Sequence, residues 1–190
     1  MLSSVRVNAP KQKRTRSYAT AKTRELERTY QRIGEFVVSF QWLENRLREI
    51  GWLILDPGKQ DWPPRSLRDE RNRDLITRVE TIYLNWLDTL DIKDREERKS
   101  DFKSTVSRFH AMREYRNNLL HSAFIELKTV GEVVGMIRSN PRLKAKQTTG
   151  DLRYDQEVLS EKVIRKRIGE LAQIGFSLNL HYMQAIHWLE

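Results

Sequence analysis

An arginine and a histidine stand five positions apart in one stretch of this chain, where Arg116 and His121 enclose the residues Asn-Asn-Leu-Leu. An arginine guanidinium binds phosphate oxygens in a bidentate manner. An imidazole, with a reference pKa of about 6.5, can accept or donate a proton near neutral pH. The pair therefore brings phosphate-directed charge and a proton carrier to one place. Because so short a pattern also occurs by chance, its surroundings must support it.

The pair falls at the end of a helix predicted over residues 93–120. Apolar residues recur there on a stripe about 140° wide, at about 100° per residue. Arg116 lies in the middle of this stripe, and Arg113 lies near one edge. Since a guanidinium keeps its charge, each arginine must find an anion or hydrogen-bond acceptors there, or extend to the surface.

The next strip around the same helix is polar and contains His110, Glu114, Asn117 and His121. Asn117 and His121 are four residues apart and can touch, so an Asn117 amide could orient the imidazole. Arg116 and His121 are about 140° apart around the axis and do not converge in one regular helix. Either the helix ends just before His121, or a second copy of the chain completes the site.

A carboxylate on an earlier helix offers the complementary charge. The spacing of apolar residues predicts a helix from residue 21 to about residue 55, with Glu44 at the centre of its apolar stripe. A carboxylate there is costly unless it is paired, so a pair with Arg113 or Arg116 is expected. Such a pair could equally be a buried bridge that only fixes helix register, and that role is favoured for Glu44.

The remaining periodicity predicts a mainly all-α chain, a bundle of four to five helices with a small β-hairpin before the last helix. Ser66 and Ser160 are the predicted caps of the second and last helices, and residues 139–151 read as a mobile basic loop. The predicted helices cover residues 21–55, 66–90, 93–120 and 160–190, and the predicted strands cover residues 123–128 and 132–138.

Length and composition bound the class of protein. The 190 residues suit one domain with a real core, and 32% charged residues fit helices with wide solvated faces. The absence of cysteine excludes disulfides, thiolate metal sites and cysteine nucleophiles, so a cytoplasmic protein is expected. No apolar run approaches the roughly 20 residues of a membrane helix.

The net charge of +9 is concentrated at the N-terminus, where residues 1–24 hold seven basic residues and no acid. We interpret residues 1–24 as a basic tail ahead of a helical domain of residues 25–190. Such a tail can bind RNA by releasing counterions, or it can be a solvated leader; it also resembles an organellar transit peptide somewhat. The candidate RNA-binding residues are Arg14 and Arg16 in the tail and Arg142, Lys144 and Lys146 in the loop.

The chain resembles the HEPN superfamily of small helical RNases, dimeric toxins and defence proteins. The resemblance rests on Arg116-Asn117-Asn118-Leu119-Leu120-His121 at the end of the third helix, on Trp42-Leu43-Glu44 in the first, and on a late long helix. It covers about residues 25–190. It implies a helical bundle that dimerises so that two copies of the motif face each other across a two-fold axis.

The resemblance also implies an activity. Members of the family cleave RNA without a metal or cofactor, using the ribose 2′-hydroxyl as nucleophile. Carried onto this chain, His121 would be the general acid or base, Arg116 would hold the phosphate, and Asn117 would orient His121 or support the interface. Glu44, Arg113 and His110 would support the site. A toxin or anti-phage effector would further imply an antitoxin or regulatory protein as partner, besides RNA.

Some features leave alternatives open. One branch of the family has a tyrosine two residues after the histidine, whereas this chain has Ala123. The insertion of residues 123–151 could lie over the RNA or be a solvated connector. For His110 a structural role is favoured over that of a second proton carrier. His181 and His187 have no nearby pair of carboxylates, so no metal site is predicted there. A catalytically silent RNA-binding protein and a helical dimerisation or adaptor module are the alternatives to an RNase.

Overall fold

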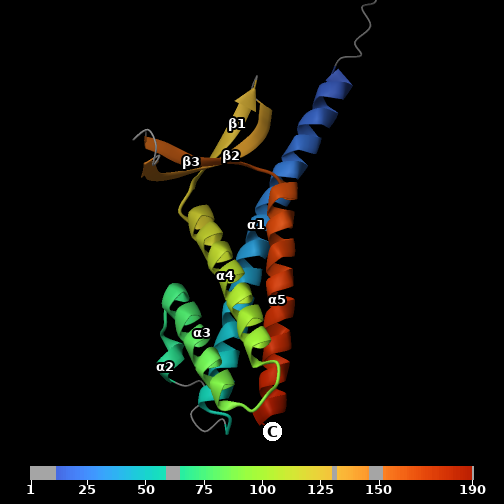
Figure 1. Ribbon diagram of the computed structural model, residues 1–190. Helices are drawn as coiled ribbons and strands as arrows, with labels where there is room; N and C mark the ends of the chain where they lie inside the picture. Colours follow the sequence, from blue (N-terminus) through green and yellow to red (C-terminus); the bar gives the residue numbers. More distant parts are fainter. Residues whose placement is uncertain (1–11, 59–64, 130–131, 146–151, 190) are drawn as a thin grey trace, which may run out of the picture. The chain divides into compact units, whose positions relative to one another are not determined.

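The computed structural model describes residues 12–58, 65–129, 132–145 and 152–189. This part of the chain is mainly helical with a small antiparallel sheet before the last helix (Figure 1), which confirms the predicted fold class. The elements are α1 (Gln12–Leu55), α2 (Arg65–Arg68), α3 (Asn72–Thr89), α4 (Arg95–Leu120), β1 (Ala123–Thr129), β2 (Glu132–Ala145), β3 (Leu152–Leu159) and α5 (Glu161–Leu189).

The chain divides into two compact units. One unit contains residues 1–33 and 122–164, which include the sheet. The other contains residues 34–121 and 165–190, which include α2, α3, α4, the second half of α1 and most of α5. We call the second one the helical unit. The division predicted from charge, a tail of residues 1–24 before a domain of residues 25–190, stays a prediction.

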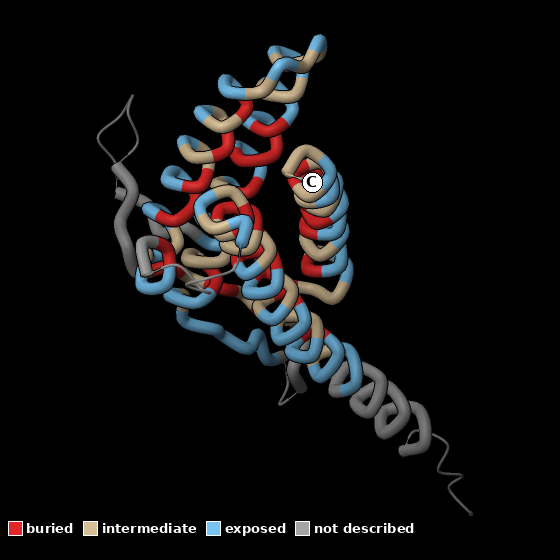
Figure 2. The backbone as a smooth tube through the Cα atoms, turned by 90° about the horizontal axis from the view of Figure 1, so that it is seen from below, coloured by how far each residue is buried: buried red, intermediate tan, exposed pale blue. Residues whose placement is uncertain are grey.

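Aromatic side chains join the helices of the helical unit. Phe40 of α1 packs on Phe109 of α4, with ring centroids 5.1 Å apart. Tyr83 of α3 stacks on Phe102 of α4 at 4.0 Å, and His181 of α5 meets the Phe102 ring edge-on at 5.0 Å. The buried residues lie along the helix faces that are turned toward one another (Figure 2). This packing fixes α4, which carries the motif, against three other helices.

The short helix α2 is held by α1. A Cβ placed on Gly51 of α1 would lie 2.6 Å from Cδ1 of Leu67, so only glycine allows α2 to approach this closely. Arg48 of α1 donates hydrogen bonds from Nη1 to the Leu67 carbonyl at 2.7 Å and from Nη2 to the Glu70 carbonyl at 3.1 Å. Leu67 lies within the single turn of α2 and Glu70 just after it, and carbonyls at the end of so short a helix lack partners within the helix.

The sheet has the strand order β1-β2-β3, and both pairs are antiparallel. Arg138 on β2 lies opposite Glu157 on β3, and its Nε donates a hydrogen bond of 2.7 Å to Glu157 Oε2. The Arg138 side chain is buried. The helix predicted over residues 93–120 is α4, and its end at Leu120 is confirmed. The predicted Ser160 cap of α5 is also confirmed, since Ser160 Oγ accepts a hydrogen bond from the Val163 amide.

Three predicted boundaries were wrong. The helix α1 begins at Gln12 and not at residue 21, so the basic segment is partly helical. The helix predicted over residues 66–90 is interrupted, because α2 ends at Arg68 and α3 begins at Asn72. The predicted loop of residues 139–151 is also wrong in large part, since β2 continues to Ala145 and pairs with a third strand that was not predicted.

Candidate functional site

The motif lies at the C-terminal end of α4. Helical structure ends at Leu120, and His121 is the capping residue with φ −97° and ψ 10°. Its backbone N–H donates a hydrogen bond of 3.0 Å to the Asn117 carbonyl, while its side chain is exposed. The structure therefore realises the first of the two geometric alternatives, in which the helix ends just before the histidine. The imidazole is free to turn and is open to solvent.

Arg116 is half-buried one turn before His121. Its guanidinium carbon lies 5.7 Å from the centroid of the Phe40 ring on α1, which places the cation against the aromatic core. Nη1 donates a hydrogen bond of 3.1 Å to Oδ1 of the adjacent Asn117. The buried Nε has no hydrogen-bond partner in the described part of the chain. Arg116 thus retains unused donor capacity next to the end of α4.

The Asn117 side chain serves Arg116 in this structure. Its oxygen accepts the Arg116 hydrogen bond, although an asparagine at this spacing was expected to orient His121. Residues at i and i+1 do not face each other on a helix, but a long arginine side chain can reach back to its neighbour. Asn117 therefore holds one amide oxygen on the guanidinium and positions Arg116.

Glu44 is buried on α1, close enough to Arg116 for the two charges to interact. Burial raises the pKa of its carboxyl, and the positive charges of Arg116 and Arg48 lower it by less. Its Oε1 has no hydrogen-bond partner among the described residues, and no ion pair forms there between Glu44 and either Arg113 or Arg116. The carboxylate is close enough to Arg116 to act on it through its charge, without the direct pair that the sequence suggested.

Replacement of Glu44 by glutamine is expected to stabilise the protein at pH 7. A carboxyl whose pKa is raised on folding favours the folded state below its unfolded pKa, and this contribution is lost as the pH rises. Glutamine removes the buried charge and keeps the shape. Chemical denaturation at pH 7 and pH 4.5 measures the effect, and we expect the gain in unfolding free energy to shrink at the lower pH. A glutamine variant less stable at pH 7 would show that Glu44 is paired in solution.

Two further residues of the site lie on the same helix. Arg113 Nη2 is 3.6 Å from Glu114 Oε1, so this arginine is partly neutralised by its own neighbour. Burial lowers the pKa of His110, and the positive charge of Arg113 lowers it further. The uncharged form of His110 is therefore favoured, and the nearby Glu80 of α3 opposes this shift of the pKa. Neither residue contacts His121 among the interactions of the described chain.

The candidate RNA-binding residues are only partly placed. The backbones of Arg14 and Arg16 belong to α1, and those of Arg142 and Lys144 belong to β2, while Lys146 lies outside the described residues. The described residues hold no group of three or more acidic or histidine side chains that could bind a metal ion. No helix in the same part of the chain has both the length and the apolar character of a membrane span.

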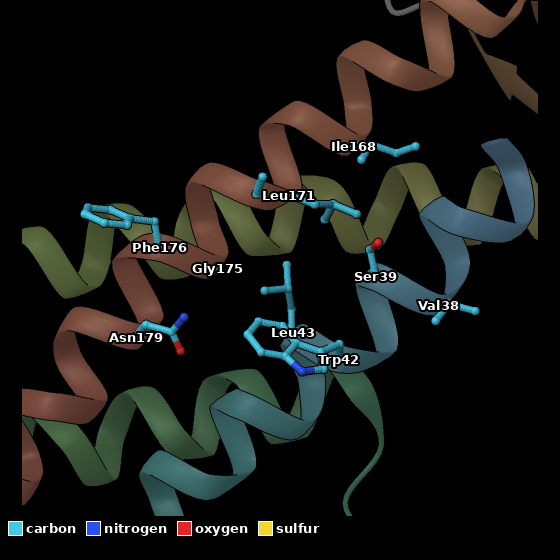
Figure 3. Close-up of a pocket in the computed structure, with 10 residues that line it drawn as sticks. Val38, Ser39, Trp42, Leu43, Ile168, Leu171, Gly175, Phe176 and Asn179 are labelled. Carbon is cyan, nitrogen blue, oxygen red and sulfur yellow. The ribbon is translucent and has the colours of Figure 1, made fainter.

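An apolar groove runs between α1 and α5 of the helical unit (Figure 3). It has a volume of about 540 Å³, and all of its lining side chains are uncharged. Gly175 of α5 lines it and lies close to α1, since a Cβ there would lie 3.0 Å from Cδ2 of Leu43. Phe176, Trp42 and Val38 are exposed around it. The sequence signal for this groove is the pair of aromatic residues, Trp42 and Phe176, that fall outside the buried stripes of the two helices.

A second feature missed by sequence reasoning is a buried histidine. His181 of α5 is 6% exposed, and its Nδ1 is 3.1 Å from the hydroxyl of Tyr83 on α3. Burial lowers the pKa of His181 to about 4; the nearby Asp101 opposes this and Arg98 adds to it. Burial also raises the pKa of the Tyr83 phenol. His181 is therefore a neutral core residue far along the chain from the motif.

Comparisons of this chain with protein-family models, with curated proteins and with solved structures gave no match. The fold class rests on the helices and sheet described above, and the site rests on the residues at the end of α4.

Proposed function

We propose that this protein is a metal-independent endoribonuclease of the HEPN type. In this proposal RNA is cleaved by attack of the ribose 2′-hydroxyl on the adjacent phosphodiester. His121 transfers the proton, Arg116 binds the phosphate, and Asn117 holds Arg116 in place. The site is composite, and two copies of the chain supply it across a two-fold axis. The protein acts in the cytoplasm as a toxin or anti-phage effector, restrained by an antitoxin or regulator.

One observation carries the proposal. The exposed His121 follows the end of α4, five residues after Arg116, and Arg116 has no carboxylate in direct contact within the described chain. A structural arginine on an apolar face is normally neutralised by an acid, because an unpaired buried charge is costly. Arg116 instead donates to a neutral amide, leaves its Nε unused, and meets the Glu44 carboxylate only through its charge, without a hydrogen bond. This arrangement suits an arginine that meets its anion only when a ligand binds.

The test is cleavage of total RNA in EDTA by the purified protein, beside Arg116→Ala and His121→Ala variants whose folding and mass are unchanged. We expect cutting by the wild-type protein alone, with 2′,3′-cyclic phosphate ends on the products. RNA binding without cutting by all three proteins would identify the catalytically silent alternative. If none of the three proteins binds or cuts RNA, the adaptor module is the remaining alternative. Equal cutting by all three would place the activity outside the motif.

A further inference from the structure

The groove between α1 and α5 is an apolar feature of the helical unit that the proposed catalytic site does not use. Its exposed aromatic residues, Trp42 and Phe176, are 49% and 68% exposed. Val38 beside Trp42 is 66% exposed, and Met183, two turns after Phe176 on α5, is 61% exposed. Large apolar side chains grouped in this way on a soluble protein mark a contact surface more often than scattered single residues do.

The groove lies on a different side of α1 from the motif. Arg116 covers the Phe40 ring on one side of α1, and Glu44 faces the same region. Trp42 and Val38 lie on the opposite side of α1 from Phe40, and they line the groove that α1 forms with α5 (Figure 3). A partner bound in the groove would therefore leave His121 and Arg116 accessible. The groove and the motif can be tested separately.

Charge selects the kind of partner that fits. The chain is strongly basic, with a net charge of +9, yet the residues lining the groove include no charged side chain. The nearest cation on α1, Arg46, forms an ion pair of 2.7 Å with Glu49 and stacks on Trp42. An acidic partner would gain nothing from such a face, whereas a second copy of the same uncharged face would meet it without like-charge repulsion.

The shape of the groove also suits self-association. An isologous interface needs a protrusion and a hollow on one surface, so that each copy supplies both. Phe176 protrudes beside the hollow that Gly175 and Leu43 form (Figure 3). An aromatic anchor seated in an apolar pocket is the usual centre of a protein interface. At about 150–250 Å² for a fully exposed aromatic side chain, Trp42 and Phe176 together offer roughly 230 Å² at their observed exposure. That is over a quarter of the roughly 800 Å² that each partner buries in a standard interface, and Val38 and Met183 add to it.

We propose that a second copy of this chain docks in the groove between α1 and α5, with Phe176 of each copy seated in the hollow of the other. This homotypic contact is separate from the one that the proposed RNase needs at the motif. Two different two-fold contacts on one chain close into a tetramer when their axes meet at right angles. The chain then carries one interface for assembly and one for catalysis.

The test measures the molar mass of the full-length protein by light scattering over a range of concentrations. Phe176→Glu places a charge in the proposed contact and is expected to raise the dissociation constant at least about 30-fold. Val158→Glu is the matched control, because Val158 on β3 is 62% exposed and lies outside the groove. Since both side chains are exposed, neither change should lower the melting temperature markedly, and circular dichroism checks this.

The outcomes separate the two contacts. A wild-type tetramer that becomes a dimer in Phe176→Glu, and not in Val158→Glu, supports both. A wild-type dimer that becomes a monomer only in Phe176→Glu supports the groove contact and removes the one at the motif. A dimer unaffected by Phe176→Glu overturns the groove contact and leaves the proposed RNase standing. A wild-type monomer at all concentrations overturns both.

Discussion

Replacement of His121 by alanine is expected to reduce RNA cleavage in EDTA by about 10²–10⁴-fold, the usual contribution of a positioned proton carrier. The imidazole is exposed at the end of α4, so its removal should leave the core packing intact. Loss of a histidine at a helix C-terminus costs only about 0.3–1 kcal/mol at the surface. The measurement is the single-turnover rate on a defined RNA, with the unfolding free energy measured on the same samples.

His187→Ala provides the control for the removal of an exposed histidine. His187 lies in the last turn of α5 and is exposed, so its position resembles that of His121. We expect the His187 variant to cleave RNA at the wild-type rate. If both variants lose activity equally, the loss reflects general basicity or folding. If the His121 variant cleaves at the full rate, the proton carrier is another residue, and the assignment of the motif is wrong.

The unfolding free energy is expected to fall by about 3 kcal/mol between pH 6.5 and pH 4 because of His181 alone. Its pKa is about 4 in the folded protein, against about 6.5 for an exposed histidine. Between these values the unfolded chain binds a proton that the folded chain excludes, so stability rises with pH across this window. Above pH 6.5 the contribution is complete, and below pH 4 no more is lost.

Urea denaturation at several pH values measures this slope. His181→Gln removes the titrating group and keeps an oxygen that can accept a hydrogen bond from the Tyr83 hydroxyl. We expect this variant to be less stable at pH 7, because it loses the ring contact with Phe102, but to show a flatter pH dependence. His187→Gln should keep the wild-type slope, since His187 is exposed. Equal slopes in all three proteins would mean that His181 is charged or solvated in the folded state.

Much of the helical fold could be predicted because its signals are local. The end of α4 and the start of α5 follow from apolar spacing and from the Ser160 cap. The strand β3 was missed although Leu152, Tyr154 and Val158 alternate with charged and polar residues. The basic residues before it suggested a loop over residues 139–151, which left no partner strand for β3 to extend. The early start of α1 was missed for the same reason, since a basic segment can still be helical.

The candidate site was predictable in its location and not in its contacts. Periodicity placed Arg116 on the buried face of α4, and the Phe40 ring is what it meets there. The hydrogen bond from Arg116 to Asn117 depends on how a flexible side chain folds back, which no spacing rule contains. The Tyr83 to His181 contact joins residues 98 positions apart, so only tertiary packing reveals it.

The hydrogen bonds from Arg48 to carbonyls at the end of α2 also have a consequence for the order of folding. A four-residue helix cannot form by itself, because nucleation fixes several residues for the gain of one hydrogen bond. The guanidinium that satisfies its C-terminal carbonyls belongs to a helix 19 residues earlier. We therefore expect the turn at residues 65–68 to form after α1, as a late step with little structure in the transition state. It should also be among the first segments to exchange its amide protons, by opening while the long helices remain folded.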